Sequence, residues 1–282
     1  MPKVAVLSDS TCDLSKDLLE KYSIGINPLY TVLDDKQYRD MLEITPDEIY
    51  AYVAKNGRLP KTAASSIGDH IDFFRPYVEQ GMEIVYFTIS GQMSVNFNNA
   101  RIAAEEFENV YVIDSENLST GIGLQVLRAA ELAAQGKSAK EIYEEILAMR
   151  ARVDASFIVE TVDYLYKGGR CSAVAALGAN LLKLRPCIEV KAGKMGVGKK
   201  YRGKMADVLQ QYAGARLADI EDIEADRIFI THSGCDEKTI QAVYDVVAQT
   251  GHFKEILITR AGCTISVHCG PGTLGVLFVH KK

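Results

Sequence analysis

The chain has 282 residues, 48% of them hydrophobic, which is enough to bury one large core or two ordinary ones. Its formal net charge of −5 argues against a general binder of nucleic acids or membrane surfaces, so no nucleic-acid partner is expected. The first residues carry no signal-peptide pattern, and no apolar run is long enough for an integral membrane segment. The six cysteines show neither CxxC nor zinc-ligand spacing, which favours reduced thiols, a cytoplasmic location and no metal site.

The first half of the chain alternates short apolar runs with amphipathic segments. Strands are predicted over 3–9, 83–90 and 110–115, and helices over 10–22, 93–107, 123–136 and 139–153. This alternation indicates a parallel sheet covered by helices, in which ligands bind beyond the carboxyl ends of the strands. The loops at these ends are SDSTCD (8–13), TISGQMS (88–94) and DSENLSTG (114–121).

The second half is richer in strands. They are predicted over 155–160, 185–203 (with a turn at Ala192–Lys194), 226–234, 255–262 and 272–280, with helices between. We therefore expect an N-terminal α/β domain over 1–153 and a C-terminal mixed α/β domain over 154–282. No linker separates them, so the two domains are expected to pack closely and form a cleft.

Two glycine-rich stretches fall short of nucleotide-binding motifs. GKMGVGKK (193–200) has Lys200 where a phosphate loop needs the hydroxyl that holds magnesium, and it alternates like a hairpin arm. TGIGLQV (120–126) lacks the third glycine of a dinucleotide fingerprint. No nucleotide cofactor is therefore expected. The acidic stretches LDD (33–35) and DIEDIEAD (219–226) are interpreted as solvated turns.

His268 stands beside a glycine-rich turn in ISVHCGPGTLGVLF (265–278). It is either a satisfied histidine next to that turn or a ring that faces a ligand, with the glycines letting the backbone pass close by. Ser94 could pair with His268 as a hydrolase nucleophile, but the sequence has no GxSxG elbow and no obvious carboxylate to orient the ring.

Another informative stretch is VDYLYKGGRCS (162–172). Its helix is predicted to end at Gly168–Gly169, which leaves Arg170 on a turn. The following helix, 173–186, would either pack in the core or line an apolar tunnel.

Seven segments together resemble the DegV family, which includes the fatty-acid-binding subunits of bacterial fatty acid kinase. They run in the family's order over essentially the whole chain: DSTCDL (9–14), PKTAASS (60–66), SGQMSVNFNNA (90–100), VIDSENLSTGIGL (112–124), VDYLYKGGRCS (162–172), LLKLRPCIEV (181–190) and HCGPGTLG (268–275). Any one of these segments alone is weak evidence for the family, whereas the whole set in this order is specific for it.

The resemblance implies a two-domain fold with a long-chain fatty acid in a tunnel between the domains. The family's carboxylate-binding threonine and serine correspond to Thr62 and Ser94, and the backbone N–H of Val95 could add a third donor. The family's arginine and histidine near the head group correspond to Arg170 and His268. A further residue, Arg202, matches a basic residue implicated in docking the kinase.

The implied function is that of a carrier rather than an enzyme. A separate ATP-dependent kinase would phosphorylate the bound acid to an acyl phosphate, and the carrier would need no cofactor and no catalytic residue. Two departures from the family bear on the ligand: the usual S-Q-P reads Ala63–Ala64–Ser65, and the usual glycine and threonine after Ser94 are Val95 and Asn96. A Ser/His acyl-ester hydrolase and a carrier of another amphiphilic acid stay open as alternatives.

Overall fold

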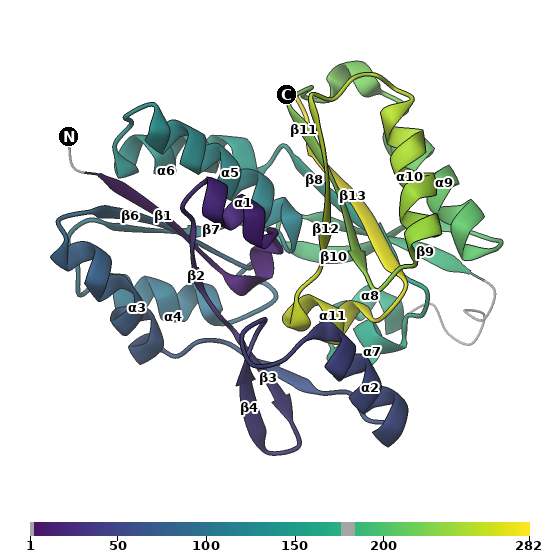
Figure 1. Cartoon of the computed structure of the whole chain (residues 1–282), viewed down its shortest axis with the longest axis horizontal. Coiled ribbons are helices and arrows are strands. Elements are labelled where there is room, and N and C mark those ends of the chain that lie inside the picture. Colours follow the sequence, from purple (N-terminus) through teal and green to yellow (C-terminus); the bar gives the residue numbers. More distant parts are fainter. Residues whose placement is uncertain (1–2, 176–183) are drawn as a thin grey trace.

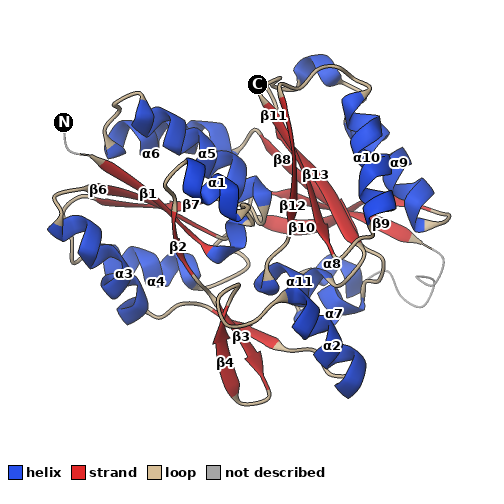
Figure 2. Ribbon diagram, in the orientation of Figure 1, coloured by secondary structure: helices blue, strands red, loops and turns tan. Residues whose placement is uncertain are grey.

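The computed structural model describes residues 3–175 and 184–282, and Figures 1 and 2 show their arrangement. The strands are β1 (Val4–Asp9), β2 (Gly25–Asn27), β3 (Tyr30–Leu33), β4 (Lys36–Arg39), β5 (Lys61–Ala63), β6 (Glu83–Thr88), β7 (Val110–Asp114), β8 (Val153–Ile158), β9 (Arg185–Lys191), β10 (Lys194–Tyr201), β11 (Arg227–Ser233), β12 (Glu255–Arg260) and β13 (Thr273–Val279). The helices are α1 (Lys16–Lys21), α2 (Pro46–Asn56), α3 (Ile67–Glu79), α4 (Asn96–Ala104), α5 (Thr120–Ala134), α6 (Ala139–Arg150), α7 (Asp163–Gly168), α8 (Ser172–Ala175), α9 (Met205–Arg216), α10 (Glu237–Ala248) and α11 (Cys263–Cys269), with the 3-10 turns η1 (Ser10–Cys12) and η3 (Ile220–Asp222).

The N-terminal half contains the predicted parallel sheet. Its strand order is β2-β1-β6-β7, and all three pairings are parallel. Helices α5 and α6 cover one face, and α3 and α4 cover the other (Figure 1). Because both faces are covered, the strands are continuous apolar runs rather than alternating ones.

The C-terminal half contains the predicted mixed sheet, ordered β10-β9-β8-β13-β11-β12. Strands β11 and β12 pair in parallel, and the other neighbours pair antiparallel. Helices α9 and α10 pack on one face. The fold class, a parallel α/β half followed by a mixed α/β half, is therefore confirmed.

Helix α5 joins the two halves. It contacts β1 and β6 of the first sheet as well as β8 and β13 of the second, and it is buried along most of its length. One hydrophobic cluster accordingly extends from Val6 to Val279 and includes both sheets. Strand β8, which begins at Val153, is the first strand of the second sheet along the chain. The division into two domains at residue 153 stays a prediction.

Several local expectations are met and others are not. The hairpin of β9 and β10 turns through Ala192 and Gly193, whose φ angles of 47° and 77° suit a tight hairpin turn. The helix expected over 10–22 is only η1 and α1, because Asp13 between them adopts the left-handed conformation, with φ 51°. The helix expected over 173–186 falls largely outside the described residues.

Strand β2 and helix α3 were not predicted from the sequence, and neither were two further parts of the fold. One is the antiparallel sheet β4-β3-β5, together with helix α2. The other is α11, which contains His268 where a turn was expected. Figure 1 shows α11 next to β3 and α2, so this C-terminal helix lies against N-terminal elements.

Within residues 3–175 and 184–282, no helix combines the length and apolar character needed to cross a membrane. The same residues contain no group of histidine, cysteine, aspartate and glutamate side chains that could hold a metal ion.

Candidate functional site

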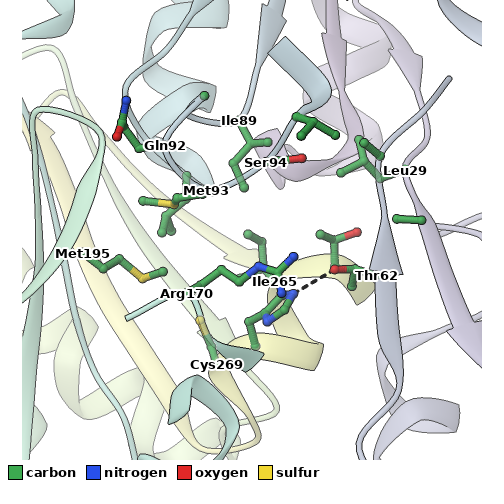
Figure 3. Close-up of a pocket in the computed structure, with 17 residues that line it drawn as sticks. Leu29, Thr62, Ile89, Gln92, Met93, Ser94, Arg170, Met195, Ile265 and Cys269 are labelled. Atoms are coloured by element: carbon green, nitrogen blue, oxygen red, sulfur yellow. Dashed lines mark hydrogen bonds between the residues drawn. The ribbon is translucent and has the colours of Figure 1, made fainter. Parts of the chain in front are cut away.

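A cavity of about 560 Å³ lies between the loops of the N-terminal half and the C-terminal half. Figure 3 shows Ile89, Met93 and Ser94 on one side of it, and Thr62 and Ile265 on the other. The apolar part of the wall includes Leu29, Ile89, Met93, Leu118, Met195 and Ile265. A concave, mostly apolar site with a few polar groups is typical of small-molecule binding.

Five of the six predicted site residues line this one cavity: Thr62, Ser94, Val95, Arg170 and His268. They come from β5, from the loop before α4, from the turn after α7 and from α11. The structure thus brings together residues that are as much as 206 positions apart in the sequence. Their individual roles in binding stay predictions.

Arg202 lies elsewhere. It is an exposed residue directly after β10, and it does not line the cavity. Lys199, Lys200 and Lys204, close to it in the sequence, are also exposed. This part of the surface is therefore basic.

The hydroxyl of Thr62 bonds to the ring of His268. Thr62 Oγ1 and His268 Nε2 are 2.8 Å apart, and Figure 3 marks this bond. Burial, with a further contribution from the charge of Arg170, lowers the pKa of His268 to about 4. The ring is therefore neutral at pH 7. Its other nitrogen, Nδ1, is buried and has no hydrogen-bond partner among the described residues.

The double glycine of α7 has two separate functions. A Cβ atom on Gly168 would lie 2.4 Å from His268 Nδ1, so only glycine allows this close approach. Gly169 ends the helix in the left-handed conformation, with φ 67°, and leaves the exposed Arg170 on the turn. Arg170 folds back and donates to the Gly168 carbonyl at 2.7 Å.

The glycines that follow His268 act differently from the expectation. Cβ atoms on Gly270 and Gly272 would collide with Tyr164 and Glu160, respectively, and neither glycine lines the cavity. They make room for the polypeptide itself rather than for a ligand. The close approach to His268 comes from Gly168 instead.

Ser94 lies immediately before α4. Its Oγ accepts a hydrogen bond from the Asn96 backbone N–H at 3.2 Å, which leaves its own O–H free to donate to a ligand. Asn96, one of the departures from the family pattern, is buried and does not line the cavity. It bonds instead to Asp9 and to Ser65, and so ties the Ser94 loop to the segment that follows Thr62.

The other departures lie at or near the wall. Ala63 and Ala64 line the cavity directly, next to Thr62. Ser65, by contrast, is buried and donates to the Pro28 carbonyl. Val95 is 66% exposed, so its side chain lies mostly in solvent at the edge of the cavity.

The three loops predicted to hold a ligand contribute unequally. TISGQMS provides five lining residues, Ile89 and the four from Gly91 to Ser94, with the buried Ser90 between them. DSENLSTG provides only Leu118. SDSTCD does not face the cavity at all, because its polar side chains are buried in hydrogen bonds to other segments. Sequence reasoning also missed Met195, whose position inside the β10 hairpin arm gave no sign of a ligand.

The hydrolase arrangement is not formed in this structure. The Nε2 atom of His268, which would have to activate a serine, is bonded to Thr62. Within the described residues, no carboxylate bonds to Nδ1 to orient the ring. A Ser–His–carboxylate relay therefore lacks two of its contacts.

The fold and this site define an α/β protein with a largely apolar ligand cavity between two sheets. The chain belongs to the DegV family: a family model described as "Uncharacterised protein, DegV family" matches residues 3–281. A DegV domain-containing protein of Clostridium perfringens is 31% identical to it, over 99% of this chain and 98% of that protein. One of Deinococcus radiodurans is 29% identical, over 97% of each.

Solved structures are similar over the whole chain. One describes fatty acid binding of a DegV family protein from Thermus thermophilus; it is 32% identical, covers 99% of both chains and has a TM-score of 0.92. DegV of Bacillus subtilis, described as a fatty acid binding protein, is 27% identical over 100% of both chains, with a TM-score of 0.87. A stearic acid-binding protein from Eubacterium ventriosum is 29% identical, with a TM-score of 0.86 over 100% of this chain and 99% of that one.

Proposed function

We propose that this protein binds a long-chain fatty acid in the cavity and presents its carboxylate to a separate ATP-dependent fatty acid kinase, which forms the acyl phosphate. The observation that carries the proposal is the mostly apolar cavity of about 560 Å³ with Thr62, Ser94, Arg170 and His268 on its wall. The similarity to structures described as fatty-acid-binding supports the same class of ligand.

The apolar wall accounts for most of the affinity. Burying a methylene is worth about 0.8 kcal/mol, so a sixteen-carbon chain gains on the order of 10 kcal/mol before the costs of ordering it. Met93 and Met195 add flexible, polarizable surface that adapts to an acyl chain. Tail burial thus sets the affinity, and the polar groups set the orientation.

The carboxylate needs donors, because an unpaired buried charge is costly. When His268 carries its proton on Nε2, it donates to Thr62 Oγ1 and leaves the threonine O–H free for the ligand. Ser94 O–H, and the Val95 N–H beside it, complete a neutral set of donors. Neutral donors suit a carrier, since they hold the acid without binding it permanently.

The cationic Arg170 suits the product better than the substrate. An acyl phosphate has more negative charge than the acid, and Arg170 lies on the wall to meet it. Phosphoryl transfer itself needs a nucleotide and a metal ion placed in line with the acceptor. The sequence has no complete motif for either, which is why we assign the chemistry to a partner. The exposed Arg202 is our candidate for docking it.

Mass spectrometry of an organic extract from the denatured protein tests the proposal. We expect one acyl chain per protein, or uptake of added palmitate by protein that was purified empty. An absence of both results would contradict fatty acid binding. Displacement of palmitate by an isoprenoid acid at a lower concentration would instead favour a carrier of another amphiphilic acid.

A further inference from the structure

A set of buried aspartates lies behind the cavity wall, where no ligand can reach it. Asp9, Asp13 and Asp40 are at most 5% exposed, and none of them lines the cavity. Asp9 is the last residue of β1, Asp13 lies a few residues beyond it, and Asp40 follows β4, so all three belong to the N-terminal half. Burying carboxylates in this number is costly unless each one is fully hydrogen-bonded.

The carboxylate of Asp40 accepts four hydrogen bonds, and three of them come from helix α11. Its Oδ1 accepts from the Cys263 N–H at 2.8 Å, and its Oδ2 accepts from the Thr264 N–H at 3.1 Å and the Thr264 hydroxyl at 2.6 Å. The fourth bond comes from the Ser10 hydroxyl at 3.0 Å. Asp13 adds a bond from the Gly262 N–H at 2.8 Å.

These bonds replace a cap that α11 lacks. Gly262 occupies the N-cap position and has no side chain to accept from the first turn of the helix. The helix is also short and rich in β-branched residues, so it has little stability of its own. The N–H groups of its first turn are satisfied instead by carboxylates from the other half of the chain.

The capped turn leads directly to the ligand site. Thr264 and His268 are four residues apart and therefore lie on the same face of α11, and both line the cavity. Any shift of Thr264 relative to Asp40 therefore moves the His268 ring relative to Thr62, which is on β5 of the N-terminal half. The opposite wall is tied to the same cluster, since Ser10 also accepts from the Leu29 N–H.

We propose that Asp40, assisted by Asp13, is a positioning residue: it clamps the first turn of α11 to the N-terminal half and so sets the His268–Thr62 pair that faces the ligand head group. The clamp also holds the two halves at a fixed separation around the cavity. The choice of palmitate as the ligand probe rests on the proposed function. The proposal that Asp40 positions α11 does not depend on that function.

Asp40→Asn is the test variant. The amide keeps the size of the side chain. Each oxygen of the Asp40 carboxylate accepts from a backbone N–H of α11, so in either orientation the NH₂ group of asparagine faces a donor, and at least one of these hydrogen bonds is lost. The matched control is Asp154→Asn, which removes a partly buried carboxylate, 15% exposed, that is also held by an ion pair. Asp154 pairs with Arg216 on the far side of the C-terminal sheet and does not touch the cavity.

Two measurements follow each variant: the release rate of radiolabelled palmitate and the ring ¹⁵N NMR signals of His268, assigned by their loss in His268→Gln. For Asp40→Asn we expect release to be about tenfold faster and the ring signals to move from one neutral tautomer toward an average of two. Asp154→Asn should release palmitate within about twofold of the wild-type rate and keep the wild-type ring signals.

Equal palmitate release rates and equal His268 ring signals in the two variants would contradict the proposed clamp, whether both variants match the wild type or both change alike. If Asp40→Asn does not fold, Ser10→Ala replaces it; this variant removes one Asp40 bond and should speed release about threefold. Wild-type protein that takes up no palmitate would contradict the proposed function. The His268 ring signals of ligand-free protein would then still decide whether Asp40 positions α11.

Discussion

Replacement of His268 by glutamine tests whether the ring is held neutral against the cavity. In the folded protein, burial and the nearby Arg170 lower the pKa of His268 to about 4. In the unfolded chain the ring titrates at about 6.5. The stability contributed by the neutral ring is therefore complete above pH 6.5 and is lost as the pH falls toward 4. Glutamine cannot titrate, but its amide can still donate toward Thr62.

The size of the effect follows from these two pKa values. Their separation corresponds to about 3 kcal/mol once the pH reaches 4, and about 2 kcal/mol of this is already lost at pH 5. Other groups act in the opposite direction. Burial raises the pKa of Asp9 to about 6 and that of Asp13 to about 8, so both carboxyl groups favour the folded state as the pH falls. The pH dependence of the unfolding free energy of the wild type alone would therefore be ambiguous.

The assay is urea unfolding of wild type and His268→Gln at about pH 7.5 and about pH 5. The aspartate contributions are common to both proteins and cancel in the difference between them. We expect the stability of wild type relative to the variant to fall by about 2 kcal/mol between the two pH values. A difference that changes by less than about 0.5 kcal/mol would refute the view that the ring is buried and neutral.

Four further predictions concern other residues of the cavity and the surface. Thr62→Val should weaken palmitate binding about five- to tenfold in calorimetry, since it removes one donor to a carboxylate; unchanged affinity would exclude the hydroxyl from the head-group site. Gly168→Ala should cost about 1–3 kcal/mol of unfolding free energy by crowding the imidazole, whereas Gly196→Ala, which meets no atom within 4 Å, should cost much less. Arg170→Ala should leave palmitate affinity within about twofold but slow phosphorylation when a kinase is added, and equal losses in both assays would contradict this division. Arg202→Ala should leave palmitate affinity unchanged and weaken only kinase-dependent turnover; an effect on binding alone would remove it from the docking surface.

Much of the fold could be predicted from local pattern. The apolar runs at 83–90 and 110–115 became β6 and β7, and the alternation before Ala192 and after Gly193 became a hairpin. Each of these signals depends on a few neighbouring residues, because side-chain periodicity and turn chemistry act over that range.

Helix α11 shows where that reasoning stops. Its sequence has no cap, begins after Gly262 and is rich in β-branched residues, so a helix was not expected there. The structure forms it because Asp40, 223 positions away from Cys263, accepts the hydrogen bonds of its first turn. No window of sequence contains both partners.

The candidate site divides in the same way. The resemblance to the DegV family pointed to Thr62, Ser94, Arg170 and His268, and the cavity brings these four together. The bond between Thr62 and His268 and the burial of the SDSTCD loop could come only from the packed structure. Periodicity and turn chemistry indicate many of the segments that become strands and helices, although not α11 or the β4-β3-β5 sheet. Which polar side chain meets another, or meets a ligand, depends on how two sheets and α5 pack, and that packing is set by contacts between residues far apart in the chain.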